Sequence, residues 1–261
     1  MTAPNDKIPS SRLIPDNDTL QAEFNDLAAG DIFIGRLRLK TSEEPLVVDL
    51  LERGVKLFPP VLAQLSCRSK VFQARIFAKY MAPHTKAIHD QHELMIAVNK
   101  YQRLGIKQVV TKKDRANAGM GINLWASVED VFNHATCASL SMPFVLQPFY
   151  QDSRDIRVII IGDYLEAYWR NNPDNFRNNL HYGGSGKPAT LTDEQFNLCR
   201  RVMERGMYPY AHLDLMVSEQ GQTYLAEINL RGGLKGAEIS SAEYKRRIEA
   251  VHQNYRREQG I

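Results

Sequence analysis

A stretch near the carboxyl end of the chain, residues 211–229, strongly limits what the protein can fold into. Two apolar runs flank the Gln-Gly dipeptide 220–221, which predicts a β-hairpin with a two-residue loop. In that register Asp214 lies directly opposite Glu227. Because side chains alternate between the two faces of a strand, Asn229 shares the face of Glu227. The hairpin therefore gathers three oxygen-bearing side chains on one face of a sheet.

These three side chains predict a metal site. Two carboxylates opposed on neighbouring strands lie roughly 5 Å apart and repel each other unless a cation offsets their charge. Two carboxylates and an amide are oxygen ligands, which favour Mg²⁺ or Mn²⁺ over zinc. We therefore expect Asp214, Glu227 and Asn229 to bind a divalent metal ion. The alternative is a solvated polar face on an exposed hairpin.

The composition is that of a globular chain. With 261 residues and 43% apolar content, it can bury a substantial core as one large domain or two small ones. No apolar run approaches the roughly 20 residues that span a membrane, and residues 1–18 lack the apolar centre of a signal peptide, so we expect a cytoplasmic protein without a membrane partner. A net charge of +3 suits anionic substrates such as nucleotides but is too small to indicate nucleic-acid binding.

The cysteines indicate no metal or disulfide framework. Cys67, Cys137 and Cys199 are widely spaced and fall in predicted helices. This spacing matches neither a zinc site nor a set of disulfides. We expect all three to be reduced core thiols.

Helix and strand signals alternate along the chain. Residues 1–28 are rich in polar residues and predict a mobile lead-in with one helical turn at 19–27. A βαβ-like unit follows, with strands at 31–34 and 55–58 and a helix between them that a Thr41–Glu44 capping box opens and Gly54 closes. Further helices are expected at 60–67, 69–81, 90–104, 127–140, 192–205 and 241–258, and further strands at 106–112, 122–125 and 143–148.

A second hairpin is predicted at residues 155–170. Its strands meet at the Gly-Asp turn 162–163, which places Asp155 opposite Arg170, with Arg157 on the same face. A charged row on one face and an apolar row on the other are typical of a sheet that lines a polar cleft. A row of charges facing solvent explains the pattern equally well.

Two loops carry residues that could bind anions. Gly119 and Gly121 follow a strand, and paired glycines let backbone N–H groups approach phosphate oxygens. A plain hairpin loop is the more common use of such a pair, and the Gly-Lys-Ser/Thr of a Walker loop is missing. The loop 171–184 is dense in asparagine around Arg177, and these groups bind anions well.

The ordered series of motifs resembles the ATP-grasp fold, in its RimK-type glutamate-ligase branch, over about residues 65–240. The matching positions are Lys112, Gly119–Gly121, Asp155–Arg157, Arg170, Phe176–Gly184, Asp214 and Glu227–Asn229. The resemblance implies an α+β fold in which two α+β subdomains clasp ATP, preceded by a shortened N-terminal α/β unit. The expected divisions are a flexible segment at 1–28, the short α/β unit at 29–68, the ATP-grasp domain at 69–240 and a C-terminal helix at 241–261.

The resemblance also implies a reaction. Such enzymes use ATP and Mg²⁺, or Mn²⁺, to activate a carboxylate as an acyl phosphate, which an amine of an amino acid, peptide or protein terminus then attacks. Two alternatives stay open. One is an ATP-grasp kinase that phosphorylates a small molecule, and the other is a nucleotide-binding regulatory subunit with weakened catalysis.

Carried over by motif, the resemblance assigns roles to single residues. The implied ATP site comprises Lys70, Lys112, Gly119, Gly121, Gln147, Phe149, Asp155 and Asn179, with Gln147 and Phe149 at the adenine hinge. The implied catalytic residues are Arg157, Arg170 and Arg177, of which the last two would steady the acyl phosphate. Asp214, Glu227 and Asn229 would hold the metal ion.

The chain also departs from the family's pattern. Pro148 stands where a hinge glutamate is usual, and this removes a carboxylate and a backbone N–H donor. His212-Leu213 replaces Gly-Val ahead of Asp214, and Leu230-Arg-Gly-Gly233 replaces a small-Pro-Gly sequence, which adds a cation near the expected substrate end. Because the leading unit is short, a second copy of the chain or a partner protein could complete the substrate pocket.

Overall fold

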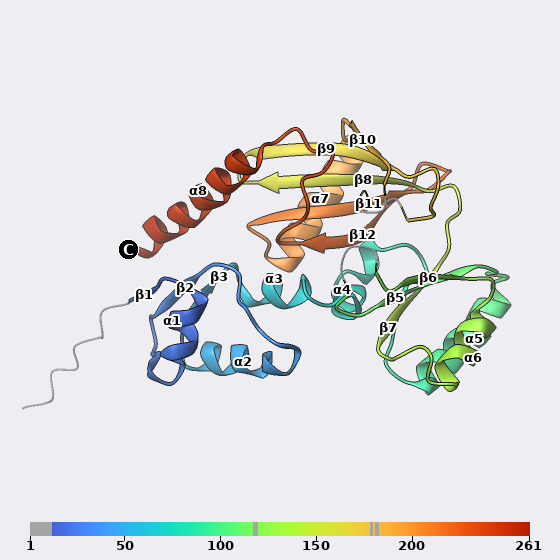
Figure 1. The fold of residues 1–261 in the computed structure, drawn as a ribbon, viewed down its shortest axis with the longest axis horizontal. Helices are drawn as coiled ribbons and strands as arrows, with labels where there is room; N and C mark the ends of the chain where they lie inside the picture. Colours follow the sequence, from blue (N-terminus) through green and yellow to red (C-terminus); the bar gives the residue numbers. More distant parts are fainter. Residues whose placement is uncertain (1–11, 117–119, 178–179, 181–182) are drawn as a thin grey trace, which may run out of the picture.

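The structure, a computed structural model, describes residues 12–116, 120–177, 180 and 183–261. Three separate sheets organise the chain (Figure 1). A small parallel sheet comes first, a four-stranded antiparallel sheet follows, and a five-stranded antiparallel sheet forms the carboxyl-terminal part. The predicted α+β class is confirmed.

The N-terminal unit is a parallel three-stranded sheet with its helices. Its elements are β1 (Leu13–Ile14), α1 (Asn17–Ala22), η1 (Phe24–Asp26), β2 (Ile32–Ile34), η2 (Thr41–Glu43), α2 (Pro45–Glu52) and β3 (Lys56–Phe58). The strand order β1-β2-β3, with α2 crossing between the last two, confirms the βαβ-like unit. Gly54, with φ +79°, ends the helix as expected.

Two local expectations for this unit differ from the structure. Residues 12–28 are not a mobile lead-in, because β1 pairs with β2 and the unit's core buries Ile14, Leu20 and Leu27. Residues 1–11 lie outside the described residues. The capping box does not involve Thr41: Glu43 accepts a hydrogen bond from the Lys40 N–H at 2.8 Å in a 3₁₀ turn. The α-helix then begins at Pro45, whose ring fixes the φ angle that the first helical position needs.

The middle of the chain forms a four-stranded sheet covered by two helices. The elements are α3 (Val61–Ser66), α4 (Lys70–Ile76), η3 (Ala78–Tyr80), β4 (Lys86–Ile88), α5 (Gln91–Arg103), β5 (Val109–Lys113), β6 (Ile122–Trp125), α6 (Val128–Thr136) and β7 (Phe144–Pro148). The strand order is β4-β7-β5-β6, and α5 and α6 bury a separate core against it. The short strand β4 was not predicted, because it has only three residues between two breaks in the pattern.

The carboxyl-terminal part is a five-stranded antiparallel sheet. Its elements are β8 (Arg154–Ile161), β9 (Tyr164–Asn171), β10 (Ser185–Pro188), α7 (Asp193–Gly206), β11 (Tyr210–Val217), β12 (Thr223–Asn229) and α8 (Ser241–Gln259). The strand order is β10-β9-β8-β11-β12, so both predicted hairpins lie side by side in one sheet. The largest core of the protein lies on this sheet.

The β11–β12 hairpin has the predicted pairing of Asp214 with Glu227, but its loop and its register differ from the prediction. Its loop has three residues rather than two, because the Ser218 N–H donates to the Gln222 carbonyl at 2.8 Å and Gly221 takes a positive φ of 81°. This loop shifts the register by one residue. A β-bulge between Asp214 and Leu215 shifts it back, and Asp214 pairs with Glu227 as predicted.

Helix α8 runs from the large sheet back to the N-terminal unit (Figure 1). Its Tyr244, Ile248 and Val251 pack on the core of the large sheet. At its far end the Tyr255 ring stacks on Phe58 at 4.1 Å between centroids. The helix therefore fixes the N-terminal unit against the large sheet, and both units contribute to the cleft described below.

The cysteines differ in burial, which corrects the expectation of three core thiols. Cys199 is buried, Cys67 is half-buried and Cys137 is exposed just after α6. Burial raises the pKa of Cys199 to about 12, which disfavours its reactive thiolate. We expect a thiol reagent at pH 8 to modify Cys137 within minutes and Cys199 only after denaturation, as counted by mass spectrometry of the intact protein. Equal labelling of both would contradict this placement.

Candidate active site

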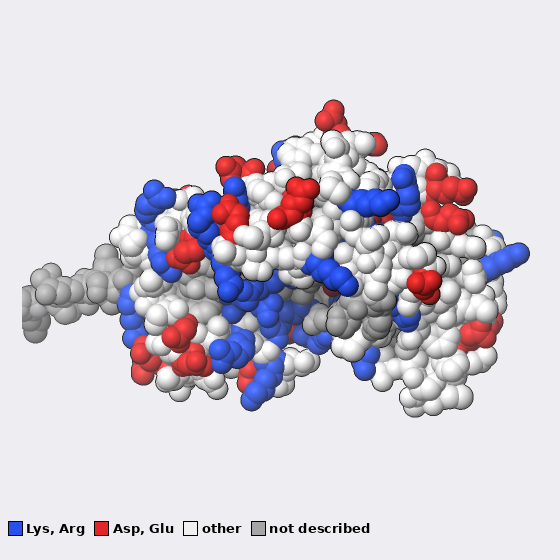
Figure 2. Space-filling view, turned by 45° about the horizontal axis from the view of Figure 1, so that its top comes forward, with Lys and Arg blue, Asp and Glu red and all other residues white. Residues whose placement is uncertain are grey.

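A cleft of about 870 Å³ lies where the N-terminal unit and the two larger sheets meet. Lysine and arginine side chains gather around the hollowed centre of the molecule (Figure 2). Most of the side chains singled out in the sequence line this cleft, namely Lys70, Lys112, Gln147, Phe149, Asp155, Arg157, Arg170, Arg177, Asp214, Glu227 and Asn229. The fold thus brings together residues that are more than 150 positions apart in the chain.

Four charged side chains form a connected network on the cleft face of β8, β9 and β11. Arg157 donates from Nε and Nη2 to the two oxygens of Asp214, both at 2.8 Å. Arg170 binds both oxygens of Asp155 and also contacts Asp214 Oδ2 at 2.9 Å. The predicted pairing of Asp155 with Arg170 is confirmed. The charged row lines a cleft rather than facing solvent.

This network sets the protonation of its carboxylates. Burial alone would raise the pKa of Asp214, but Arg157 and Arg170 together hold that pKa well below its usual range. Burial raises the pKa of Asp155, and Arg170 only partly opposes the rise. The pKa of Arg170 is raised because Asp214 and Asp155 outweigh the effect of burial. Asp214 therefore stays an anion in the folded protein.

The cations that offset the opposed carboxylates are side chains. Asp214 forms ion pairs with Arg157 and Arg170. Glu227 Oε1 accepts a hydrogen bond from Lys70 Nζ at 2.9 Å. Lys70, the first residue of α4, also donates to the Ala116 carbonyl at 2.7 Å. Our premise that these carboxylates need a bound metal ion to coexist is therefore wrong.

Lys112 differs from the other cations in the cleft. The residue lies near the end of β5. Its ammonium has no hydrogen bond or ion pair with any residue that the structure describes. Burial lowers its pKa, although Glu227, Asp214 and Asp155 pull the pKa upwards and Lys70 pulls it down. A desolvated ammonium close to carboxylates, without a direct partner, is suited to receive an anionic ligand.

Several oxygens of the predicted metal site are uncommitted and fit a hard cation. Glu227 uses only Oε1, and the Asn229 side chain makes no hydrogen bond within the described part of the chain. Both residues lie on β12 and line the cleft. Asp214 fits less well, because its two oxygens already accept three contacts from arginines. No cluster of three His, Cys, Asp or Glu side chains is found within the described ranges.

The predicted adenine hinge lies on β7 and just after it. Gln147 is buried, and its Nε2 lies 3.9 Å from the sulfur of Met216 on β11. Pro148 pairs with Val109, and the Phe149 N–H donates to the Gln108 carbonyl at 3.0 Å. Pro148 has no backbone N–H, and the N–H of Phe149 already donates to Gln108. Fewer backbone donors are therefore available to hydrogen-bond an adenine base.

Described residues next to or within the two predicted anion-binding loops, namely Ile122, Phe176 and Arg177, line the cleft. Gly121 has a φ of +78°, and a Cβ there would lie 2.7 Å from the Cβ of Lys113, so the turn requires glycine. Arg177 donates from Nη2 to the Ile122 carbonyl and stacks on the Phe176 ring. The loop after β9 therefore contacts the start of β6. Gly119 and Asn179 lie outside the described residues.

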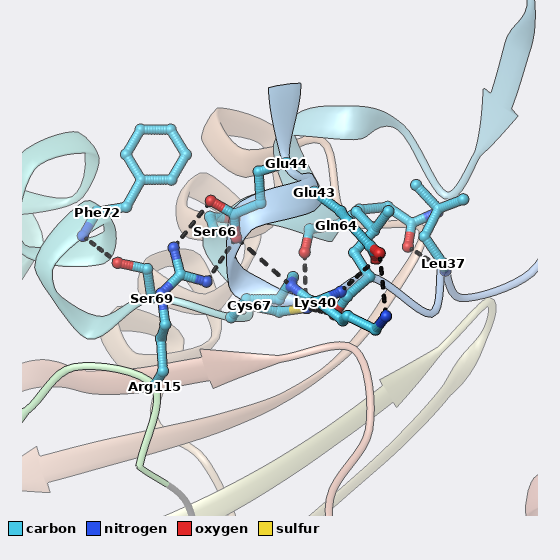
Figure 3. A network of polar contacts seen from close by, with 12 residues as sticks. Leu37, Lys40, Glu43, Glu44, Gln64, Ser66, Cys67, Ser69, Phe72 and Arg115 are labelled. Carbon is cyan, nitrogen blue, oxygen red and sulfur yellow. Dashed lines mark hydrogen bonds and ion pairs between the residues drawn. The ribbon is translucent and has the colours of Figure 1, made fainter. Parts of the chain in front are cut away.

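Sequence analysis missed a network that connects the loop after β5 to the N-terminal unit. Arg115 binds both oxygens of Glu44 at 2.5 and 2.8 Å (Figure 3). Arg68 Nε lies 3.6 Å from the same carboxylate. Asp114 accepts from the Ser69 hydroxyl at 2.9 Å. No short-range pattern indicates a pair such as Glu44 and Arg115, which are 71 positions apart.

His212, one of the departures from the family's pattern, lies beneath the cleft. Its Nε2 lies 3.0 Å from the Tyr244 hydroxyl of α8, and burial followed by Arg157 lowers its pKa to about 4. A Cβ on Gly232 would lie 2.5 Å from His212 Nδ1. The turn after β12 therefore packs its backbone directly on the neutral imidazole, which explains a glycine at 232.

Solved structures with a similar fold include the D-cycloserine synthetase DcsG, with a TM-score of 0.62, 13% identity and coverage of 85% of this chain and 83% of that one. The N5-carboxyaminoimidazole ribonucleotide synthetase purK has a TM-score of 0.64 and 14% identity, with coverage of 91% of this chain and 64% of that one. The ATP-grasp ligase PsnB, solved with Mg and ADP, has a TM-score of 0.52 and 14% identity, with coverage of 82% of this chain and 68% of that one. These likenesses show the fold, which is the ATP-grasp fold.

Residues 67–248 match the RimK-like ATP-grasp domain, and the chain belongs to this family. A probable alpha-L-glutamate ligase of Trichodesmium erythraeum is 26% identical over 195 residues, which are 72% of this chain and 64% of that protein. A probable alpha-L-glutamate ligase of Xylella fastidiosa is 34% identical over 102 residues, 38% of this chain and 34% of that protein. The ribosomal protein bS6--L-glutamate ligase of Escherichia fergusonii is 27% identical over 145 residues, 52% and 46% of the two chains.

The chain spans between 34% and 64% of the length of these relatives. Among the residues described, no helix is long and apolar enough to cross a membrane. The family and the ATP-grasp fold inferred from the ordered motifs are thus confirmed, while the roles of single residues stay predictions.

Proposed function

We propose that the protein is an ATP- and Mg²⁺-dependent ligase that activates a carboxylate as an acyl phosphate and joins it to an amine. The observation that carries this proposal is the uncommitted ammonium of Lys112, which shares a cleft with the uncommitted oxygens of Glu227 and Asn229. A cation without a partner suits phosphate groups, and free carboxylate and amide oxygens suit Mg²⁺. The names of the relatives agree with ligase chemistry.

In this mechanism the protein's residues mainly hold and orient the reactants. Lys112 and Lys70 would bind phosphate oxygens as point charges. Glu227 and Asn229 would hold the metal ion, together with Asp214, whose orientation Arg157 and Arg170 fix. When bound, Mg²⁺ would neutralise charge on the phosphates as phosphoryl transfer proceeds. Positioning and electrostatic stabilisation then lower the barrier, and no side-chain nucleophile is required.

The arginines of the cleft would stabilise the negative charge of the acyl phosphate and of the tetrahedral intermediate. Arg170 is held by two carboxylates, so its guanidinium is fixed in place before the substrate arrives. The amine attacks the acyl carbon, phosphate leaves, and an amide bond is formed. The amine belongs to an amino acid, a peptide or a protein terminus.

One observation favours a second candidate, a nucleotide-binding subunit with weakened catalysis. Three contacts from arginines occupy Asp214, and the N–H of Phe149 is committed to Gln108. Both features would weaken binding of metal and adenine. The outcome of a turnover assay distinguishes the two candidates.

The assay is a screen of amino acids and small carboxylates for release of ADP and phosphate in the presence of ATP and Mg²⁺. A ligase releases both products together and forms an amide, which mass spectrometry detects. A kinase releases ADP without phosphate and forms a phosphorylated product. Nucleotide binding without any turnover across the screen would favour the regulatory candidate.

We expect ATP to raise the melting temperature more in Mg²⁺ than in EDTA. Stabilisation of the folded protein by a ligand increases with the affinity of that ligand, and Glu227 and Asn229 would hold the metal ion that accompanies ATP. Differential scanning fluorimetry at matched ionic strength measures both shifts. The same shift in EDTA and in Mg²⁺ would show that these oxygens do not hold a metal bridge.

A further inference from the structure

The cleft carries more positive charge than ATP requires. Eleven lysine and arginine side chains line it, against the three carboxylates of Asp155, Asp214 and Glu227. Glu44, which does not line the cleft, pairs with two of these cations, Arg115 and Arg68. ATP with Mg²⁺ adds about two net negative charges, so several cations still lack a counterpart. A surplus of cations inside a cleft attracts anionic ligands and is costly if it stays unpaired.

Besides Lys112, two of these cations have no direct partner among the residues that the structure describes. Arg36 follows β2, and Arg231 follows β12. Both side chains are exposed, both line the cleft, and neither makes a hydrogen bond or ion pair within the described part of the protein. Arg38, two residues beyond Arg36, differs because it points to the surface and pairs with Asp18 at 2.8 Å.

The backbone around each of these arginines is held in place. On either side of Arg36, the Gly35 N–H donates to the Phe58 carbonyl at 2.7 Å, and the Leu37 N–H donates to buried Gln64 at 2.9 Å. Figure 3 shows the second contact. Arg231 lies between buried Leu230 and Gly232, which packs on His212. Each guanidinium is thus carried by a fixed segment but is itself uncommitted.

The two guanidinium groups approach the same part of the cleft. Burial raises the pKa of Tyr244, and Arg231 and Arg36 are the two groups that oppose this rise. The same two arginines oppose the effect of burial on Tyr210. Both residues line the cleft, and Arg36 follows β2 of the N-terminal unit, which lies at the opposite end of the molecule from β7 (Figure 1).

We propose that Arg36 and Arg231 form a second anion-binding site in the cleft, for a phosphate or carboxylate group of the substrate other than the carboxylate that is activated. A guanidinium presents parallel N–H donors that match either oxyanion, and two of them from different units can hold one group from both sides. The substrate would then carry at least two anionic groups. This inference rests on the proposed function for the place of ATP in the cleft and for the carboxylate that is activated.

The test is binding of two probes, inorganic phosphate and glutarate, to protein saturated with Mg²⁺ and a non-hydrolysable ATP analogue, so that the triphosphate site is filled. Calorimetric titrations at constant ionic strength compare the parent with Arg36→Gln, Arg231→Gln and the matched control Arg38→Gln. We expect affinity for the preferred probe to fall about tenfold in each of the first two variants and to stay unchanged in the control. Tighter binding of phosphate would indicate a phosphorylated substrate, and tighter binding of glutarate a polycarboxylate.

Equal affinities in all four proteins, or no detectable binding of either probe to the parent, would overturn the proposal. All three arginines are exposed, so the variants should fold, which circular dichroism checks. If the ATP analogue itself fails to bind, the proposed function is in error. The same titrations without nucleotide, in a Lys112→Met background, then still decide whether Arg36 and Arg231 bind an anion.

Discussion

Replacing Lys112 by methionine should weaken ATP binding about ten- to a hundredfold while the protein remains folded. A charged hydrogen bond to phosphate is worth about 1.5–3 kcal/mol, and each 1.4 kcal/mol changes affinity about tenfold. Methionine keeps most of the apolar stem that packs along β5 and removes only the charge. The affinity is measured by calorimetric titration with ATP in EDTA, so that the metal ion does not contribute.

The neighbouring residue supplies a matched control. Lys113 is exposed and does not line the cleft, so Lys113→Met should leave ATP affinity unchanged. In the absence of ATP, Lys112→Met should unfold at the same or a slightly higher denaturant concentration, because the lost ammonium is desolvated and has no direct partner. A folded Lys112→Met protein with unchanged ATP affinity would show that the triphosphate binds elsewhere.

The pH dependence provides a second readout for Lys112. Burial lowers the pKa of this ammonium in the folded protein below its ordinary value of 10.5. Between the lowered pKa and 10.5 the unfolded chain binds more protons, so the contribution of Lys112 to stability rises with pH in that window. ATP affinity should fall over the same window as the ammonium becomes neutral. Lys112→Met should show neither effect.

Local patterns in the sequence predicted the sheet that carries the site. Alternation of apolar residues located β8, β9, β11 and β12, and tight-turn residues paired Asp155 with Arg170 as observed. The pairing of Asp214 with Glu227 was predicted correctly, but from a two-residue loop and a regular ladder that the structure does not have. A three-residue loop and a bulge shift the register in opposite directions, and neither irregularity is visible in a pattern of apolar alternation.

Contacts between distant segments could not be predicted in this way. The pairs Lys70–Glu227 and Arg115–Glu44 join units whose relative placement depends on tertiary packing, and no spacing in the chain indicates them. The ionic partners of Asp214 lie on adjacent strands, but only the strand order β9-β8-β11 brings Arg157 and Arg170 to the same carboxylate. That order changes which carboxylate is expected to be essential for stability.

Asp214→Asn should therefore destabilise the protein much more than Glu227→Gln. In EDTA, Asp214→Asn should lower the free energy of unfolding by about 3 kcal/mol, since removal of one partner from a buried ionic network leaves the others uncompensated. Glu227→Gln should change it by no more than about 1 kcal/mol, because Glu227 is more exposed and has a single ionic partner, Lys70. Urea unfolding of the parent and both variants measures these differences.

The stability deficit of Asp214→Asn should also depend on pH. In the folded protein the pKa of Asp214 lies below its ordinary value of 3.8, so its stabilising contribution is fully present above that value. The contribution is lost as the pH falls through the lowered folded pKa. The difference between parent and variant should thus be constant near neutrality and shrink in strong acid. A difference that grew on acidification would contradict the role of the arginines.

Turnover separates the metal site from the ionic network. If Glu227 and Asn229 hold Mg²⁺ against the phosphates, Glu227→Gln should lose ATP turnover by at least about a hundredfold although its stability in EDTA is close to that of the parent. Glu219, which is exposed in the loop of the same hairpin, gives the matched control Glu219→Gln, which should retain full activity. A Glu227→Gln protein that is clearly destabilised in EDTA and still turns over ATP would assign Glu227 to the structural network with Lys70, and the proposed metal site would have to be abandoned.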